Sequence, residues 1–231
     1  QFTQLWNARD GILTASLEAT KPPITALAFS ADSQKLVHTS PADGLVWVWN
    51  CATGEPDLIL IEAADGCTLE DIAYHPNGQW VACGGIDYLS TGERDGAVVV
   101  WNLPTKEKKF VLDTGVYALS FDPAGKYLAG AGINDTVYLW DVESQETIFE
   151  LAGHQEKINA VAFDPTGSYL LSGGDDGTVR VWDVLSGRLI VVREFDSPVQ
   201  SLAFGHDGRD LFLGNGNTTC YHVEFKKILE D

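Results

Sequence analysis

The sequence predicts an all-β protein made of a repeated four-stranded antiparallel unit, and three observations support this prediction. A strand pattern ending in tryptophan recurs as "LVWVWN", "VVVWN", "TVYLWD" and "TVRVWD". Runs of alternating apolar and polar residues are separated by short turns rich in Gly, Pro, Asn and Asp, as expected for half-buried strands. No window of the chain has a good helical period, and 45% apolar with 21% charged residues is typical of a globular domain.

The tryptophan positions set the period of the repeat. The anchors Trp6, Trp49, Trp101, Trp140, Trp182 and, in a degenerate last copy "TTCYHVE", Tyr221 are 43, 52, 39, 42 and 39 residues apart. A period of about 40 residues indicates a repeat architecture. We expect a single domain, with repeats over about residues 8–50, 51–102, 103–141, 142–183 and 184–224, and residues 1–7 as a strand of a preceding unit.

Each repeat has the same internal order. An alternating run such as "INAVAFD" leads through a turn such as "PTGS" into a small-residue run such as "YLLSGG". A second tight turn precedes the tryptophan strand, and a fourth alternating run such as "ETIFELA" follows it. Four antiparallel strands per repeat, repeated radially, predict a β-propeller with about five full repeats. The tail "FKKILED" is expected to begin another outer strand.

Period, strand order, turns and the terminal Trp-Asp together resemble the WD-repeat family over essentially the whole chain. Two full repeats depart from the motif, because they end in Trp-Asn. The family most often has seven blades, which implies that this chain is the C-terminal part of a larger propeller. Another segment or a second copy would then complete it; a closed five-bladed ring is the alternative.

A polar turn residue stands six positions before each anchor. An Asp or Asn there can bond nearby backbone N–H groups and tolerate unusual dihedral angles; the residues are Asp43, Asp95, Asn134, Asp176 and Asn215. The resemblance implies that His154, Ser172, Asp176 and Trp182 form one structural hydrogen-bond network inside a blade. The other repeats lack the Gly-His that precedes such a network.

Chemistry at these residues is not expected. Ser, His and Asp could form a hydrolase triad, but Ser172 lies mid-strand among apolar neighbours, whereas a nucleophile needs exposure and substrate room. The run Asp175-Asp176 is too short to supply the six or more oxygens that calcium requires. We predict no catalytic residue, no metal and no cofactor. The four cysteines lack a Cys-x-x-Cys pair, which favours free thiols in a reducing, cytoplasmic compartment.

The 52-residue interval comes from the insertion "IDYLSTGER" at residues 86–94. Loops on rigid scaffolds often carry function, so Asp87, Tyr88, Glu93 and Arg94 are candidate partner contacts; the alternative is a tolerated surface insertion. In the family the residue before each turn Asp points to the same face, which adds Asp175 to the candidates. Its counterparts are Ala42, Arg94, Ile133 and Gly214.

The charge of the chain limits its partners. A formal net charge of -18 argues against binding nucleic acid or anionic membranes and permits a basic protein partner. The small basic cluster Lys106, Lys108 and Lys109 is interpreted as a solvated outer edge. The predicted function is a non-catalytic protein–protein interaction scaffold or adaptor. The alternative is a ligand- or substrate-binding sensor propeller that serves a catalytic domain elsewhere in a larger protein.

Overall fold

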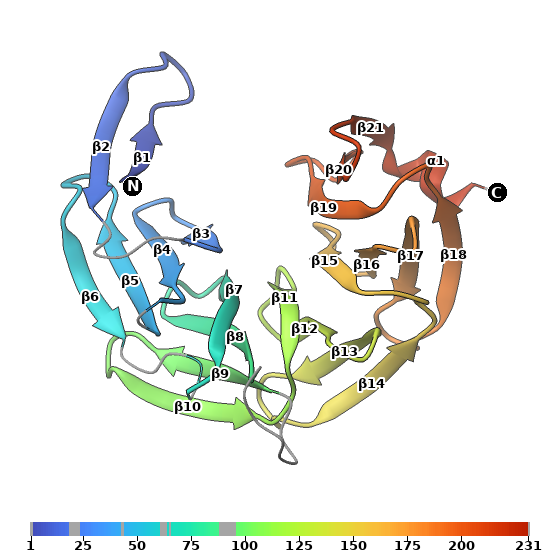
Figure 1. Cartoon of the computed structure of the whole chain (residues 1–231), viewed down its shortest axis with the longest axis horizontal. Coiled ribbons are helices and arrows are strands. Elements are labelled where there is room, and N and C mark those ends of the chain that lie inside the picture. Colours follow the sequence, from blue (N-terminus) through green and yellow to red (C-terminus); the bar gives the residue numbers. More distant parts are fainter. Residues whose placement is uncertain are drawn as a thin grey trace. The chain divides into compact units, whose positions relative to one another are not determined.

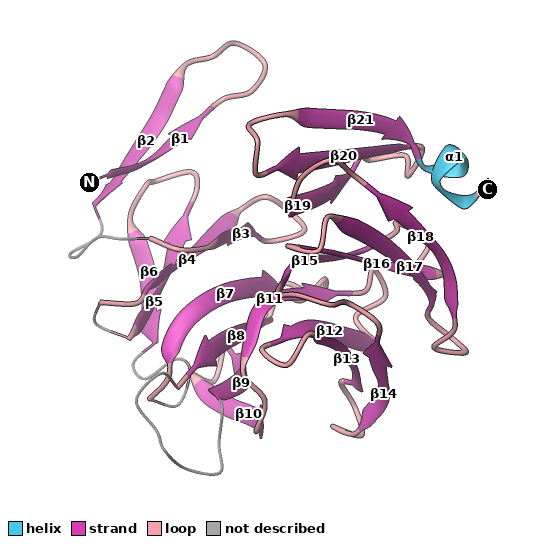
Figure 2. Ribbon diagram, turned by 45° about the vertical axis from the view of Figure 1, so that its right-hand side comes forward, coloured by secondary structure: helices cyan, strands magenta, loops and turns pink. Residues whose placement is uncertain are grey.

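The computed structural model describes residues 2–18, 24–42, 44–60, 64, 66–87 and 96–230, without the side chains of Phe2 and Glu18. Within these residues the chain is built of antiparallel strands and one short helix (Figures 1 and 2), so the all-β prediction is confirmed. The chain divides into two compact units, unit 1 (residues 1–115) and unit 2 (residues 116–231). Each unit is described by itself.

Unit 1 contains a two-stranded sheet, β1-β2, and two four-stranded sheets, β3-β4-β5-β6 and β7-β8-β9-β10. Its strands are β1 (Phe2–Trp6), β2 (Leu13–Glu18), β3 (Leu27–Phe29), β4 (Lys35–Ser40), β5 (Leu45–Asn50), β6 (Pro56–Leu60), β7 (Thr68–Tyr74), β8 (Trp80–Ile86), β9 (Gly96–Asn102) and β10 (Glu107–Leu112).

Unit 2 contains two four-stranded sheets, β11-β12-β13-β14 and β15-β16-β17-β18, and the three-stranded sheet β19-β20-β21. Its elements are β11 (Val116–Phe121), β12 (Tyr127–Gly132), β13 (Thr136–Asp141), β14 (Thr147–Ala152), β15 (Ile158–Phe163), β16 (Tyr169–Gly174), β17 (Thr178–Asp183), β18 (Leu189–Glu194), β19 (Val199–Phe204), β20 (Asp210–Asn215), β21 (Cys220–Glu224) and the helix α1 (Phe225–Leu229).

The sequence repeat and the sheet are offset by one strand. Each sequence repeat supplies the fourth strand of one sheet and the first three strands of the next, as in β14 followed by β15-β16-β17. Among the described residues, β1 is therefore followed by five sets of four strands, as the sequence predicted. The described strand pairings are antiparallel, and in the sheet β15-β18 the adjacent strands are joined by tight turns.

The tail was predicted to begin a strand, and this prediction is wrong. Residues Phe225–Leu229 form the helix α1, which buries Phe225 and Ile228 against the sheets β15-β18 and β19-β21. Those two residues and Leu229 are spaced three and four positions apart, which places them on one side of a helical turn. The run is too short for its helical period to show against the alternation of the preceding strand. No helix in the described part of the chain is long and apolar enough to cross a membrane.

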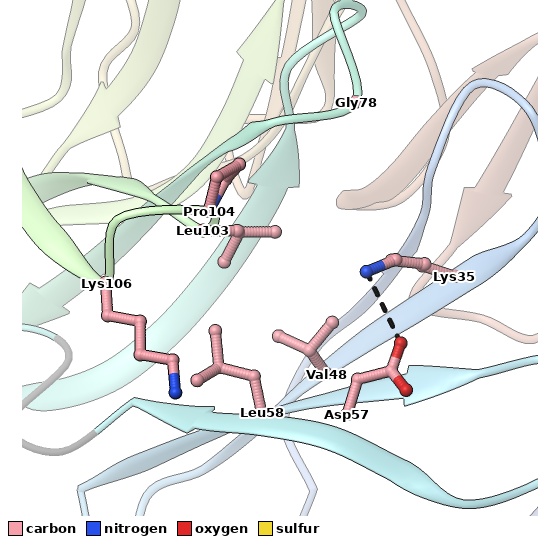
Figure 3. Close-up of a pocket in the computed structure, with 8 residues that line it drawn as sticks. All are labelled: Lys35, Val48, Asp57, Leu58, Gly78, Leu103, Pro104 and Lys106. Carbon is pink, nitrogen blue, oxygen red and sulfur yellow. Dashed lines mark ion pairs between the residues drawn. The ribbon is translucent and has the colours of Figure 1, made fainter.

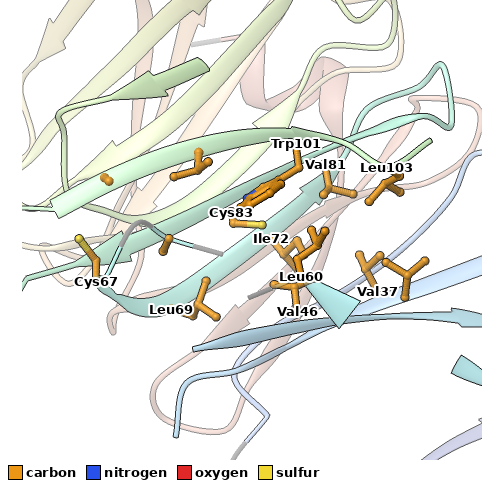
Figure 4. Packing of buried hydrophobic residues seen from close by; sticks show 14 residues of the cluster. Val37, Val46, Leu60, Cys67, Leu69, Ile72, Val81, Cys83, Trp101 and Leu103 are labelled. Atoms are coloured by element: carbon orange, nitrogen blue, oxygen red, sulfur yellow. The ribbon is translucent and has the colours of Figure 1, made fainter. Parts of the chain in front are cut away.

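The core of each unit lies between facing sheets. In unit 1, Val46, Val48 and Leu60 pack against Ile72, Val81 and Trp101 of the adjacent sheet (Figure 4). In unit 2, Val137 and Leu139 pack with Val161 and Trp182 between the sheets β11-β14 and β15-β18. Alternate residues of the inner strands point to opposite faces, so each central sheet of a unit contributes to a core on both sides.

The turn after each tryptophan strand explains why Trp-Asp and Trp-Asn both occur. Asp141 Oδ1 accepts the backbone N–H groups of Glu143 and Ser144, and Asn50 Oδ1 accepts those of Ala52 and Thr53. The side chain after the tryptophan therefore serves as a turn cap, and an amide oxygen does this as well as a carboxylate.

Candidate functional site: a polar network beneath the β16–β17 turn

The four residues of the expected network are joined by hydrogen bonds at one end of the sheet β15-β18. His154 Nδ1 lies 2.9 Å from Asp176 Oδ2, and His154 Nε2 lies 2.8 Å from Ser172 Oγ. The indole N–H of Trp182 donates to Ser172 Oγ over 2.9 Å. Ser172 comes from the middle strand β16, Trp182 from β17, Asp176 from the turn between them, and His154 from the loop before β15.

One proton assignment satisfies every atom of this network. The Trp182 N–H donates to Ser172, the Ser172 hydroxyl donates to His154 Nε2, and His154 Nδ1–H donates to Asp176. This assignment requires a neutral imidazole. Burial lowers the pKa of His154, and it does so despite the opposing effect of the Asp176 carboxylate. The neutral form is therefore the one that the folded protein favours.

The carboxylate of Asp176 accepts more hydrogen bonds than the sequence predicted. Burial opposes its ionised form, but the N–H of Thr178, the N–H of Gln155 and the Thr178 hydroxyl all donate to it, and the net effect lowers its pKa. Thr178 was not predicted as a network residue. A threonine also stands at the equivalent position of two other sheets, Thr136 at the start of β13 and Thr219 directly before β21.

This arrangement has the connectivity of a hydrolase triad but not its accessibility. Ser172 is 0% exposed, and its acceptor capacity is taken by the Trp182 indole. A serine nucleophile must reach a substrate carbonyl beside donors for the developing oxyanion. Because nothing can reach Ser172 in the folded protein, these residues stabilise the blade and position its turn.

The register of the other sheets shows why the network occurs once among the described sheets. The position of Ser172 is taken by His38, Cys83, Gly130 and Leu213. Burial raises the pKa of the Cys83 thiol, which keeps that cysteine protonated and unreactive. Gly130 leaves space that the six-membered ring of Trp140 fills. The sheets thus have different side chains at the same buried position.

The last repeat was aligned wrongly by two residues at the sequence level. The strand pair β20–β21 joins Leu211 to Val223, as β16–β17 joins Leu170 to Trp182, so Val223 and not Tyr221 holds the anchor position. The turn residue equivalent to Asp176 is then Asn217, whose Oδ1 accepts both the N–H and the hydroxyl of Thr219. The predicted turn residue Asn215 and its neighbour Gly214 lie in β20 instead. Tyr221 resembles the other anchors because it is aromatic, but strand pairing sets the register and places Val223 there.

Asp175 lies next to the network on a polar surface that spans three sheets of unit 2. Its Oδ1 accepts the amide of Asn159 at 2.7 Å and the amide of Gln200 at 3.1 Å, from β15 and β19. Its backbone N–H donates to the carbonyl of Lys157, and the Lys157 ammonium lies 3.8 Å from the ring centroid of Tyr117 in β11. We call Tyr117, Lys157, Asn159, Asp175 and Gln200 the Asp175 surface.

The other candidate contact residues belong to unit 1. Asp87 is partly buried directly after β8. The candidates Tyr88, Glu93 and Arg94 lie outside the described residues, as do the turn residues Asp43 and Asp95. Within the described ranges, no group of three or more His, Cys, Asp or Glu side chains is placed to hold a metal ion.

Comparison with known proteins agrees with this geometry. WD repeat-containing protein 91 homolog of Dictyostelium discoideum is 28% identical over 127 residues, which cover 54% of this chain and 16% of that protein. Guanine nucleotide-binding protein subunit beta of Arabidopsis thaliana is 27% identical over 275 aligned positions, covering 94% of this chain and 72% of the relative. Periodic tryptophan protein 2 of Arabidopsis thaliana is 28% identical over 167 residues, 67% of this chain and 17% of that protein.

The family described as WD domain, G-beta repeat matches residues 11–50, 63–102, 107–141 and 145–183. These matches cover more than half of the chain and end at Asp183, before the repeat whose anchor is Val223. Four matched copies, their strand order and the tryptophan at the end of each third strand lead to one conclusion: the chain belongs to the WD40 family.

Proposed function

We propose that this chain is a non-catalytic protein-interaction scaffold that contacts its partner through the Asp175 surface. WD40 domains commonly bind proteins. The observation that carries the proposal is the state of the Asp175 carboxylate. Two amides orient its Oδ1, while Oδ2 has no hydrogen-bond donor among the described residues and the side chain remains partly exposed.

The physical argument is one of preorganisation. Two interactions hold the backbone at Asp175. Its neighbour Asp176 belongs to the buried network, and the N–H of Asp175 donates to the carbonyl of Lys157. A partner that donates a hydrogen bond to Oδ2 would not have to order this side chain, so less entropy is lost on binding. Lys157 and Tyr117 place a cation and an aromatic ring beside it, which suits a partner surface of mixed charge.

The test is a quantitative affinity purification with the Asp175→Arg variant of the full protein. We expect proteins retained by the wild type to be lost, and the Asp175→Asn variant to give partial retention. Glu143→Arg is the matched control, because Glu143 is an exposed turn residue in the same unit and undergoes the same change of charge. Equal recovery from wild type and Asp175→Arg, with thermal midpoints unchanged, would refute the assignment of this surface.

We also propose that the protein works in a reducing compartment such as the cytoplasm. Cys51, Cys67, Cys83 and Cys220 are all free thiols in this fold, and Cys220 is exposed. Alkylation of the protein in intact cells, followed by mass spectrometry, should label the accessible thiols without prior reduction. Recovery of Cys220 in a disulfide would contradict the proposal.

A further inference from the structure

Unit 1 contains a second candidate binding site, which lies between the sheets β3-β6 and β7-β10. A cavity of about 240 Å³ is open there (Figure 3). Its apolar lining includes Val48 and Leu58 from the first sheet, and Leu103 and Pro104 from the turn after β9. Small-molecule pockets usually measure ~300–1,000 Å³, so this cavity is better matched to a single aliphatic side chain.

A second hollow adjoins the first along β6. It has a volume of about 330 Å³ and shares the lining residues Asp57, Leu58 and Lys106 with the first, adding Pro56 and the 40%-exposed Ile59. Two hollows that share one lysine form an elongated crevice. In an extended peptide, every second side chain points to the same face at a spacing of about 7 Å. Side chains four positions apart can therefore enter the two hollows, and the side chain halfway between them can reach the shared lysine.

The crevice carries positive charge in a protein that is strongly acidic. Lys35 Nζ pairs with Asp57 over 3.3 Å, whereas Lys106 has no ion pair among the described residues. Figure 3 shows the side chain of Lys106 extending toward Leu58. Against a net charge of -18, the ammonium of Lys106 favours an acidic ligand at this crevice.

The backbone at Lys106 supports a role for its side chain. Lys106 has a φ of 62°, and the equivalent turn positions of other repeats hold Gly54 and Gly187 at φ of 71° and 66°. A left-handed conformation is unfavourable for a residue with a Cβ, so glycine would be the more stable choice here. Gln145 stands at a fourth copy of this turn with a φ of 65°. Strained residues of this kind often mark functional positions.

We propose that this crevice binds an extended segment of a partner protein in which one carboxylate lies between two aliphatic side chains. The aliphatic groups fill the two hollows on either side of Leu58, and the carboxylate pairs with Lys106. The site is in unit 1 and shares no residue with the Asp175 surface, so it is a second, independent point of contact. In this proposal Lys106 binds a ligand, whereas the sequence predicted that it is part of a solvated outer edge.

The probe for this proposal is the acetylated and amidated peptide Leu-Ser-Glu-Ser-Leu, in which the three larger side chains share one face. We expect saturable shifts of the backbone amide NMR signals of residues 57–59, 103 and 105–107 of the full chain during titration. The peptide Leu-Ser-Gln-Ser-Leu tests the carboxylate, and Ala-Ser-Glu-Ser-Ala tests the aliphatic groups; both should bind more weakly.

The decisive variant is Lys106→Gly, because it removes the ammonium and relieves the backbone at the same time. We expect stability to be unchanged or higher, while affinity for the probe falls about fivefold, the equivalent of an ion pair worth roughly 1 kcal/mol. Gln145→Gly is the control for the backbone: it relieves the same left-handed conformation in the equivalent turn of unit 2 without removing a charge, and it should leave binding unaltered. The proposal is overturned if the wild type shows no saturable binding, if Lys106→Gly binds as the wild type does, or if the glutamine peptide binds equally well.

Discussion

At the scale of single residues, the chain uses polar side chains to hold turns rather than to perform chemistry. The Asp or Asn after each tryptophan caps one turn, and Asp176 or Asn217 caps another. His154, Ser172 and Trp182 extend this function into the interior of one sheet. A satisfied buried hydrogen bond contributes about 1 kcal/mol, but an orphaned partner costs ~1–3 kcal/mol, so loss of one member affects the others.

Replacing His154 by alanine should destabilise the protein without directly removing a binding contact. The change leaves the Ser172 hydroxyl without its acceptor and opens a cavity where the imidazole was. We expect a loss of roughly 2–4 kcal/mol in the free energy of unfolding, measured by thermal or denaturant unfolding. His206→Ala is the control, since His206 is exposed. A thermal midpoint equal to that of the wild type would rule out a stabilising network.

The same histidine should make stability depend on pH. Burial lowers the pKa of His154 below its usual value of 6.5, so the unfolded chain binds a proton at a pH where the folded protein does not. Stability from this site is therefore complete above about pH 6.5 and decreases as the pH falls below it. Asp176, whose pKa is also lowered, adds a further loss only at pH values below its ordinary 3.8.

Thermal midpoints measured between pH 7.5 and pH 5 provide the check. The wild type should lose stability across this range more steeply than His154→Gln, because the variant lacks the titrating group. Parallel curves for the two proteins would show that protonation of His154 is not linked to folding.

At the scale of the elements, four-stranded sheets of the same topology tolerate different residues at the same buried position. The space beside the tryptophan is taken by a hydroxyl at Ser172, a thiol at Cys83 and nothing at Gly130. The sheets therefore share the same strand order and pairing, and each is closely packed with different side chains.

Gly130→Ala should be costly for this reason. An added Cβ would lie 2.6 Å and 2.7 Å from two ring carbons of Trp140, an indole that is 1% exposed, and 3.0 Å from Val116. Overpacking of this kind typically costs about 1–3 kcal/mol. Gly216→Ala is the control, because its Cβ would meet ordinary contacts of 3.6 Å or more on an exposed turn. Equal unfolding free energies for the two variants would contradict the packing described for Trp140.

At the scale of the whole molecule, two compact units each contain their own inter-sheet cores, and the chain carries a large negative charge. Within each unit, sheets that follow one another in the sequence pack against each other, which is how repeat proteins distribute their stability. The sequence pI is about 4.4, so the protein is highly anionic at neutral pH. Its partners are expected to be proteins rather than polyanions.

The charge leads to a direct prediction for nucleic acid. A fluorescein-labelled double-stranded DNA oligonucleotide should show no change in anisotropy when titrated with the protein at about 0.15 M salt, because phosphate contacts require a basic surface. Binding that weakens as salt is raised would contradict this expectation and would direct attention to the lysines around Lys106.

The sequence by itself determined the all-β class, the repeat near 40 residues and the strand order, while the resemblance to the WD-repeat family implied four members of the His154 network. The all-β class, the repeat period and the strand order depend on local alternation, turn chemistry and motif spacing, which are properties of short segments of the sequence. Only the tertiary structure placed Val223 at the last anchor, folded residues 225–229 as a helix, and brought Asn159 and Gln200 to Asp175 from different sheets. The crevice beside Lys106 also depends on how two sheets face each other. Strand register and contacts between sheets are decided by packing between segments that are far apart in the sequence, and local periodicity does not predict them.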